Sequence, residues 1–307
     1  MVVYESSDLR AYWVEGSPEA LLVTFSHVGH GDADGTFFGR NLVRASGMSA
    51  LGIVDRRDRW FPHAAMAELL TVVVERTATF RHVILFGSSM GAYGALRYSR
   101  ALHATSVIAW APQWSIAPHD LGDADYRYRR YFDSACHADM AVRSEDIDGQ
   151  AFIFFDPHEP SDRFHALRLA ELAPAHVFHI QMPMLGHEVG HAFASTASML
   201  QLFSACREGN CSLIQTLART VRRRAPRRAL GISLALLDRR PACAETLFGT
   251  IRSQVSPALR MSWVERAVWA ACRRGAMEDA SRHMIDSADL EALYPRRFEE
   301  LRRRLAG

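Results

Sequence analysis

The chain has 307 residues, of which 49% are hydrophobic and 23% charged, enough for a globular protein with a sizeable core. No apolar run approaches the roughly 20 residues of a membrane-spanning helix. Residues 1–10 carry acids where a secretory signal has basic residues and then an apolar run, so we expect a cytoplasmic protein. The five cysteines are scattered without a CxxC pair, which predicts neither a disulfide framework nor a zinc site. Neither a metal nor another cofactor is expected.

All 36 basic residues are arginines, and their distribution along the chain is uneven. Residues 205–307 hold 20 arginines against 11 acidic residues, a net charge of +9. The first 204 residues hold the other 16 arginines against 23 acidic residues, a net charge of −7. This split predicts two units with different surfaces, a domain over residues 1–204 and an arginine-rich unit over residues 205–307.

Short apolar runs alternate with helical patterns through the first two-thirds of the chain. Near-continuous apolarity is typical of strands buried on both faces of a parallel sheet, and the βαβ series predicts an α/β fold, a mostly parallel sheet flanked by helices. An edge hairpin is expected over residues 2–5 and 10–16. The predicted strands are 20–26, 49–55, 82–87, 105–111, 151–156 and 175–181, and the predicted helices are 63–78, 91–102, 162–172 and 187–205.

The strand over residues 82–87 runs directly into Gly87-Ser88-Ser89-Met90-Gly91 and then into a helical pattern. Gly-x-Ser-x-Gly between a buried strand and a helix is the pattern of a nucleophile elbow. Side chains two positions before or after the serine would collide with the neighbouring strand and helix, which explains the glycines. The pattern predicts a strained turn that exposes the Ser89 hydroxyl above the carboxyl end of the sheet.

The alternating pattern lapses between residues 112 and 149, which predicts a functional insertion or lid. Its stretch DADYRYRRYFDSA (123–135) interleaves aromatic and arginine side chains. Such a face suits sugars, by stacking, and anions, by forked hydrogen bonds. A solvated amphipathic helix is an equally good interpretation.

After residue 205 only helical patterns remain, which predicts an all-helical C-terminal extension. The similar stretches ACREGN, LDRRPA and ACRRGA begin at residues 205, 237 and 271. This spacing resembles degenerate helix-hairpin repeats of roughly 34 residues, and a plain helical bundle explains it nearly as well. A helical surface of this kind suggests a protein partner. No nucleic-acid motif accompanies RRRAPRR (222–228), so no nucleic-acid partner is expected.

Residues 1–204 resemble the α/β-hydrolase superfamily, through the elbow, the long insertion and the order of serine, acid and histidine. Bacterial hydrolases encoded near surface-polysaccharide genes are similar in their GSSMG elbow and in a stretch like DPHEPSDRFH (156–165). The resemblance implies that Ser89 is the nucleophile and that the amide of Met90 supplies half of an oxyanion hole. The other half would come from the loop at residues 26–35, through the amide of His27 or Val28.

The resemblance also places a catalytic histidine just after the last strand. There, HIQMPMLGHEVGH (179–191) offers His187 in the loop and His191 four residues later, and position favours His187.

The resemblance leaves three candidates for the acid, Asp156, Glu159 and Asp162. Spacing from the strand end favours Glu159, whereas residue type and the following helix favour Asp162, which we adopt. Asp162 is also a good helix N-cap, and Asp156 is equally suited to fixing the loop.

These residues predict a serine hydrolase that acts on an ester, thioester or amide through an acyl-serine intermediate. The likeness to polysaccharide-associated hydrolases suggests a glycan or glycolipid ester, or another small-molecule ester, as the substrate. Two alternatives stay open. One is an acyltransferase that uses the same triad, and the other is a binding or scaffold protein on an inactive hydrolase fold.

Overall fold

The computed structural model describes residues 1–31 and 35–306 of the chain. These residues divide into two compact units, Met1–Arg222 and Arg223–Gly307. The sequence predicted the boundary at residue 204. The first unit instead extends to Arg222 and so includes most of the helix Cys211–Arg224. None of the helices in the described part of the chain combines the length and apolarity needed to cross a bilayer.

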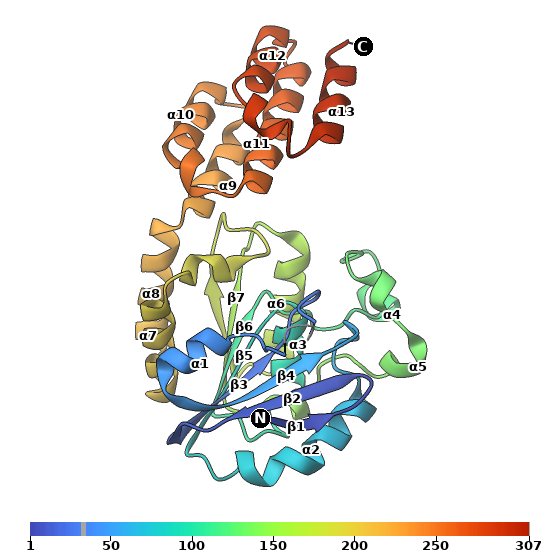
Figure 1. The fold of residues 1–307 in the computed structure, drawn as a ribbon, viewed down its shortest axis with the longest axis vertical. Coiled ribbons are helices and arrows are strands. Elements are labelled where there is room, and N and C mark those ends of the chain that lie inside the picture. The colour runs from blue at the N-terminus through green and yellow to red at the C-terminus, as the bar shows by residue number, and fades with distance from the viewer. Residues whose placement is uncertain (32–34, 307) are drawn as a thin grey trace. The chain divides into compact units, whose positions relative to one another are not determined.

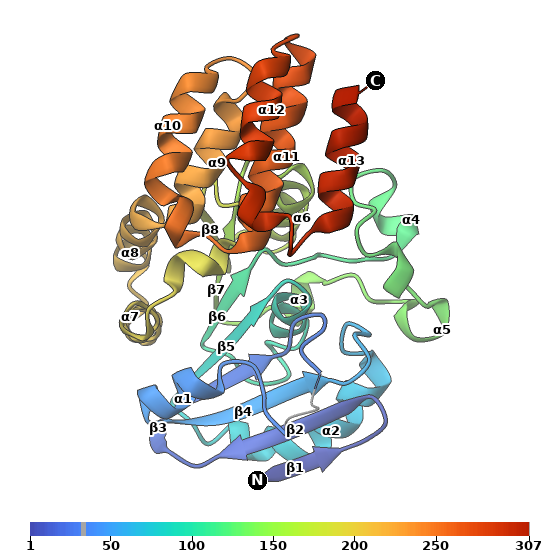
Figure 2. The same ribbon diagram turned by 45° about the horizontal axis from the view of Figure 1, so that its top comes forward.

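An eight-stranded sheet forms the centre of the first unit (Figure 1). Its strands follow the order β1-β2-β4-β3-β5-β6-β7-β8, in a series that Figure 2 shows from a second side. Strand β2 pairs antiparallel with β1 and with β4, and every other pair is parallel. The mostly parallel sheet and its edge hairpin are therefore confirmed. The strands are β1 (Val2–Glu5), β2 (Leu9–Val14), β3 (Ser17–Phe25), β4 (Met48–Asp55), β5 (His82–Ser88), β6 (Ser106–Trp110), β7 (Gln150–Phe155) and β8 (Val177–Gln181).

Helices cover both faces of this sheet (Figure 1). Three of them, α2 (His63–Thr77), α3 (Met90–Arg97) and α6 (Pro160–Leu172), pack on one face, where alternate strand side chains form the main core. The other face carries α1 (Arg40–Ser46) and α7 (Thr196–Arg207). This layering confirms the predicted α/β class. Helices on both faces bury both sides of the central strands, which explains why these strands are apolar at nearly every position.

The helix predicted over residues 187–205 begins later than expected. Residues 187 and 188 precede a short 3-10 turn, Val189–Phe193, and α7 starts only at Thr196. The Ser195 hydroxyl accepts a hydrogen bond from the Ser198 amide at 3.1 Å and so caps that helix. The delay leaves His187 in a loop at the carboxyl end of the sheet.

The insertion between β6 and β7 contains two short helices, α4 (Pro118–Leu121) and α5 (Ser134–His137). It is fixed to the rest of the unit by buried hydrogen bonds. The Tyr93 hydroxyl, on α3, donates to the Met140 carbonyl at 2.7 Å. Within the insertion, the Trp114 indole donates to the Val142 carbonyl at 2.9 Å. The segment is thus an ordered part of the domain.

The second unit is helical throughout its described residues, as expected of the C-terminal extension. The stacked rings of Phe248 and Trp263, with centroids 4.0 Å apart, lie in its core. Each of the three similar sequence stretches, the first of which belongs to the first unit, lies at a junction between two successive helices. The helices from residue 211 onward are α8 (Cys211–Arg224), α9 (Pro226–Leu236), α10 (Pro241–Ile251), α11 (Pro257–Arg273), α12 (Met277–Ile285) and α13 (Pro295–Ala306).

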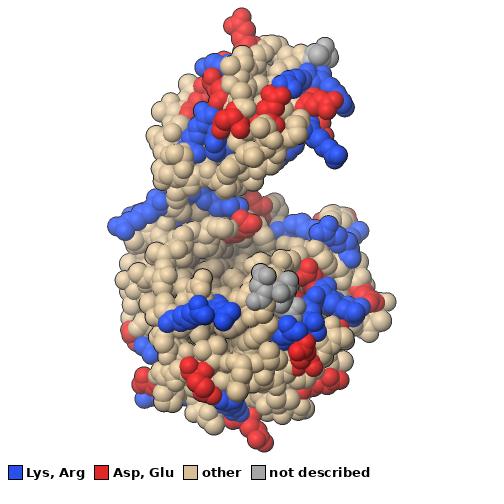
Figure 3. Space-filling model, in the orientation of Figure 1, with Lys and Arg blue, Asp and Glu red and all other residues tan. Residues whose placement is uncertain are grey.

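The arginines of the second unit lie among acidic side chains. On the face shown in Figure 3, blue and red side chains of these helices alternate. Examples are the ion pairs Arg273–Asp238, at 2.7 Å, and Arg302–Glu291, at 2.6 Å. Because the two kinds of charge are mixed, this face does not present one uniformly basic patch. Exposed ion pairs of this kind stabilise a helix surface only slightly.

Candidate active site

Ser89 occupies a strained turn between β5 and α3. Its backbone has φ 52° and ψ −117°, a region that residues with a side chain rarely adopt. The Ser89 amide donates to the Trp110 carbonyl at 2.8 Å, which ties the turn to the neighbouring strand. The helix that follows begins at Met90, so the first amides of α3 start beside the Ser89 hydroxyl.

Two glycines make this turn sterically accessible. A Cβ on Gly87 would lie 2.2 Å from the backbone of Gly91, and a Cβ on Gly91 would lie 2.4 Å from the Phe25 carbonyl oxygen. Both distances are far inside van der Waals contact. The first turn of α3 therefore lies directly against the end of β3, where the loop with His27 begins.

His187 joins Ser89 to Asp162. Its Nε2 lies 3.0 Å from the Ser89 hydroxyl oxygen, and its Nδ1 lies 2.9 Å from an Asp162 carboxylate oxygen. A carboxylate accepts hydrogen bonds and does not donate them, so Nδ1 carries the ring proton and Nε2 accepts. The imidazole side chain is 27% exposed, whereas the Asp162 side chain is fully buried.

Asp162 is held in its ionised form. Burial alone would raise the pKa of its carboxyl group, but the hydrogen bond with His187 and the charges of His187 and Arg127 outweigh burial and lower the pKa below its usual value. Asp162 lies in the first turn of α6, after the N-cap position at Glu159. A buried carboxylate at this place can orient the imidazole and can stabilise a positive charge on it.

The other candidates for acid and histidine lie elsewhere in the site. Buried Asp156 accepts hydrogen bonds from the amides of Leu185 and Gly186, at 2.8 and 2.7 Å, and so fixes the loop before His187. Half-buried Glu159 occupies the N-cap of α6. Exposed His191 pairs with Glu188 at 3.1 Å. Of the three carboxylates, Asp162 is the one that contacts the ring of His187.

Two side chains of the insertion also contact Ser89, and the sequence analysis assigned neither of them to the site. The Tyr128 hydroxyl lies 3.2 Å from the Ser89 hydroxyl and 3.1 Å from Nε2 of His187. The buried Gln113 amide nitrogen donates to the Ala111 carbonyl at 3.1 Å and lies 3.3 Å from the Ser89 hydroxyl. The alternation of arginine and tyrosine at 126–131 was the one sequence signal for Tyr128.

Arg127 links the insertion to Asp162. One of its guanidinium nitrogens donates to Asp162 at 2.8 Å and to Asp125 at 2.7 Å. Burial alone would raise the pKa of Asp125, but hydrogen bonds from His165 and Arg127 outweigh burial and hold the pKa well below its usual value. The Trp114 amide donates to Nδ1 of His165, so Nε2 of that ring donates to Asp125, at 3.1 Å.

A cavity of about 530 Å³ opens above Ser89. The aromatic rings of Phe38 and Trp110 line it together with Tyr128, and so do His27 and Val28 of the loop after β3. Both candidate residues for the second oxyanion amide therefore border the same cavity as Ser89. Residues 32–34 of that loop lie outside the described residues.

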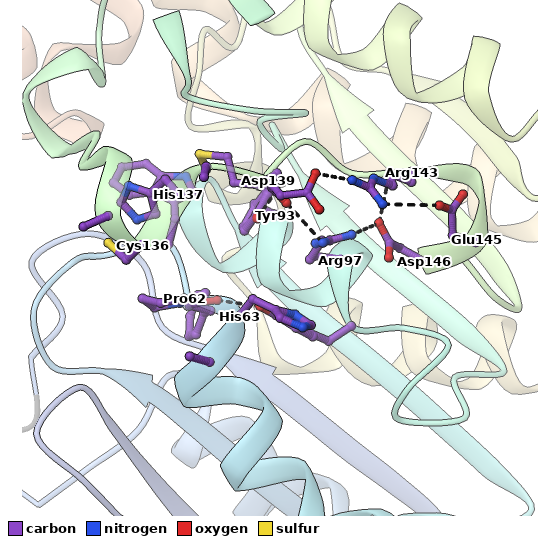
Figure 4. A pocket seen from close by; sticks show the side chains of 17 residues that line it. Pro62, His63, Tyr93, Arg97, Cys136, His137, Asp139, Arg143, Glu145 and Asp146 are labelled. Atoms are coloured by element: carbon purple, nitrogen blue, oxygen red, sulfur yellow. Dashed lines mark hydrogen bonds and ion pairs between the residues drawn. The ribbon is translucent and has the colours of Figure 1, made fainter. Parts of the chain in front are cut away.

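A second cavity of the same volume, about 530 Å³, lies against α3 and the insertion (Figure 4). Its charged side chains pair with one another, Arg97 with Asp146 and Arg143 with Asp139. Neither Ser89 nor His187 lines it. We assign its side chains to fixing the insertion. Within the described ranges, no group of His, Cys, Asp or Glu side chains is arranged to hold a metal ion.

The chain has no match among protein-family models and none among curated protein sequences. It is similar in structure to a capsule O-acetyltransferase of Neisseria meningitidis serogroup A, with a TM-score of 0.47, 14% identity, and coverage of 67% of this chain and 93% of that one. It is also similar to Est1E from Butyrivibrio proteoclasticus, with a TM-score of 0.46, 11% identity, and coverage of 68% and 99%. A third similar structure is the alpha/beta hydrolase domain-containing protein 10 from mouse, with a TM-score of 0.46, 12% identity, and coverage of 68% and 98%.

All three TM-scores lie below 0.5 and all three identities below 15%, so the names of these structures say nothing about what this chain does. The topology of this chain supplies its own evidence. The sheet is mostly parallel and is covered by helices on both faces. Its strand β5 ends in a strained turn at Ser89, and α3 begins directly after that turn. The first unit therefore has the α/β-hydrolase-like fold that the sequence resemblance implied.

Proposed function

We propose that this chain is a serine hydrolase that cleaves an ester through an acyl-serine intermediate. The observation that carries the proposal is the position of the His187 imidazole, with Nε2 at 3.0 Å from the Ser89 hydroxyl and Nδ1 at 2.9 Å from buried Asp162. Nucleophile, base and orienting carboxylate are thus within hydrogen-bond reach of one another, which is the geometric criterion for nucleophilic catalysis.

In the first half of the reaction, the Ser89 oxygen attacks the ester carbonyl carbon while Nε2 of His187 accepts the hydroxyl proton. The carbon–oxygen bond to the alcohol then breaks, and the imidazolium returns the proton to the departing oxygen. Asp162 stabilises the imidazolium meanwhile. In the second half, water loses a proton to Nε2 as its oxygen attacks the acyl carbon. The bond between that carbon and the Ser89 oxygen then breaks, and the imidazolium returns the proton to Ser89. An alcohol in place of water gives acyl transfer by the same steps.

Two backbone amides would stabilise the negative oxygen of each tetrahedral intermediate. We assign one to Met90, which directly follows the nucleophile at the start of α3, and the other to His27 or Val28. Removing one donor of this kind typically costs roughly 3 kcal/mol of transition-state stabilisation. The close approach of α3 to the end of β3 supports the pairing of these two chain segments.

For the substrate, we propose an ester carried by a glycan or glycolipid. The support is the lining of the cavity, since rings such as Trp110, Phe38 and Tyr128 suit stacking against the apolar faces of sugars. A comparison of p-nitrophenyl esters of increasing chain length with acetylated sugars tests this choice. Clear preference for long-chain alkyl esters over acetylated sugars would contradict it.

The test of the enzyme proposal is labelling with a fluorophosphonate probe, which reacts with activated serines. We expect the native chain to be labelled and Ser89→Ala to be unlabelled and inactive on p-nitrophenyl acetate, with an unchanged melting temperature. Ser144→Ala is the matched control, because this serine of the insertion is exposed and its hydroxyl donates to exposed Glu145 at 3.1 Å. Well-folded native chain that stays unlabelled would instead support an inactive scaffold.

A further inference from the structure

The hydroxyl of Tyr128 forms a nearly equilateral triangle with the two reacting atoms of the proposed site. It lies 3.2 Å from the Ser89 oxygen and 3.1 Å from Nε2 of His187, which are themselves 3.0 Å apart. Any alcohol or water that attacks an acyl group on Ser89 must give its proton to Nε2 and approach the carbon bonded to the Ser89 oxygen. The phenol oxygen therefore lies where the attacking or departing oxygen would lie.

Tyr128 also competes for the one acceptor position of the base. Nδ1 of His187 carries a proton that faces Asp162, so Nε2 has a single lone pair. The hydroxyls of Ser89 and Tyr128 both lie within reach of that lone pair. Burial raises the pKa of Tyr128, which keeps its phenol protonated and able to donate. Once Ser89 is acylated it has no proton to donate, and the phenol then has the lone pair to itself.

Packing holds the phenol in this position. The Tyr128 ring packs against the buried indole of Trp60, with centroids 5.2 Å apart. The preceding residue, Arg127, is fixed by its hydrogen bonds to Asp125 and Asp162. A single water molecule must displace a phenol held on two sides, whereas an acceptor bound elsewhere in the cavity brings binding energy of its own.

We propose that Tyr128 is a specificity-determining residue that occupies the acceptor position and thereby favours transfer of the acyl group to a bound alcohol over its loss to water. This proposal rests on the proposed function, since it requires an acyl group on Ser89. One tyrosine of the alternating arginine and tyrosine stretch thereby has a role beside the reacting atoms. The acceptor class is an alcohol, because its hydroxyl replaces the hydroxyl of the phenol.

The experiment compares Tyr128→Phe with the native chain by burst kinetics with p-nitrophenyl acetate, with and without added glycerol as the alcohol acceptor. Loss of one competing hydrogen bond should speed hydrolysis of the acyl-enzyme by between about two- and tenfold. The ratio of glycerol acetate to free acetate should fall by a similar factor. The initial burst, which reports acylation of Ser89, should remain.

Tyr131→Phe is the matched control. Its ring packs on the same Trp60, with centroids 5.1 Å apart, and its hydroxyl accepts from Arg130 at 2.8 Å. This variant should keep the native ratio of products. Melting temperatures of both variants separate a local effect from a loss of folding.

The outcomes separate the two proposals. Slower hydrolysis or an unchanged product ratio in Tyr128→Phe, with a normal burst and fluorophosphonate labelling in the native chain, would overturn the acceptor role of Tyr128. Absence of burst and label from folded native chain and from both variants would overturn the proposed function itself. Faster hydrolysis in Tyr131→Phe as well would show a general loosening of the insertion and would also overturn the assignment.

Discussion

The side chains around Ser89 come from two regions, and different forces place them. Ser89 and Asp162 lie where helices of the sheet framework begin, and His187 lies in the loop after β8. Gln113, Arg127 and Tyr128 come from the insertion between β6 and β7, where regular structure is sparse. The first set is positioned by backbone geometry and burial of whole strands, and the second by individual hydrogen bonds and ring contacts.

This difference separates chemistry from selectivity. The framework residues form the proposed relay of proton and charge, so any loss among them should remove turnover. The insertion residues reach these side chains through single hydrogen bonds, so their loss should change rate, partition or stability by smaller factors. Substitutions in the two regions test this division directly.

The largest effect is expected for Asp162→Asn. An amide in place of the triad acid lets the imidazole settle in the wrong tautomer, which costs up to ~10⁴-fold in turnover in the best-studied case. Glu159→Gln is the matched control and should change turnover little, because Glu159 lies at the N-cap of α6. Turnover of p-nitrophenyl acetate above pH 7 measures both. A large loss at Glu159 with little loss at Asp162 would reverse the choice of acid.

A smaller effect is expected for Arg127→Met, with Arg129→Met as the matched control. Arg127 donates to Asp162 at 2.8 Å, whereas Arg129 donates to the Gly122 carbonyl at 2.9 Å. A hydrogen bond to a charged group contributes roughly 1.5–3 kcal/mol, so turnover should fall between about ten- and a hundredfold in Arg127→Met and stay native in the control. A loss as large as that of Asp162→Asn would place Arg127 within the catalytic relay and break the division between the regions.

The smallest effect is expected in the pH dependence of stability. The pKa of Asp125 is lower in the folded chain than the ordinary value of 3.8, so its contribution to the free energy of unfolding is present above that pH and declines as the pH falls below it. Asp125→Asn should therefore be less stable than the native chain near pH 6, and the gap should narrow towards pH 3. Urea unfolding at both pH values measures the gap. A gap that widens in acid would contradict the lowered pKa.

The sequence predicted the framework well because its signals are local. Apolar runs define buried strands, and Gly87 and Gly91 are required by steric contacts that lie within the turn or against the next strand. Parallel strands bring their carboxyl ends to one edge, so the loops with Ser89, Asp162 and His187 had to meet near it. The catalytic roles of these residues stay predictions.

The insertion was harder to predict because its contacts are tertiary. Nothing local indicates that Arg127 pairs with a carboxylate 35 residues later, or that the Tyr128 ring packs against Trp60. Its stretch was given a sugar- or anion-binding face or a solvated helix as alternatives. In the structure, Arg127 pairs with carboxylates of the chain itself, whereas Tyr128 packs against Trp60 and also lines the cavity above Ser89. The delayed start of α7 was missed for a similar reason, since the helical pattern there does not distinguish a 3-10 turn from the first turns of a helix.

The buried side chain of Asp156 links the segment that carries the proposed catalytic acid to the loop that carries the proposed base. It lies at the end of β7, six residues before Asp162, and accepts from the amides of Leu185 and Gly186, directly before His187. The segment that holds Asp162 and the loop that holds His187 are therefore joined through Asp156, so their relative position does not depend on the contact between imidazole and carboxylate alone. Ser89 is fixed to a different part of the sheet, because its amide donates to the Trp110 carbonyl, so its distance from His187 depends on how β5 and β6 lie relative to these two segments.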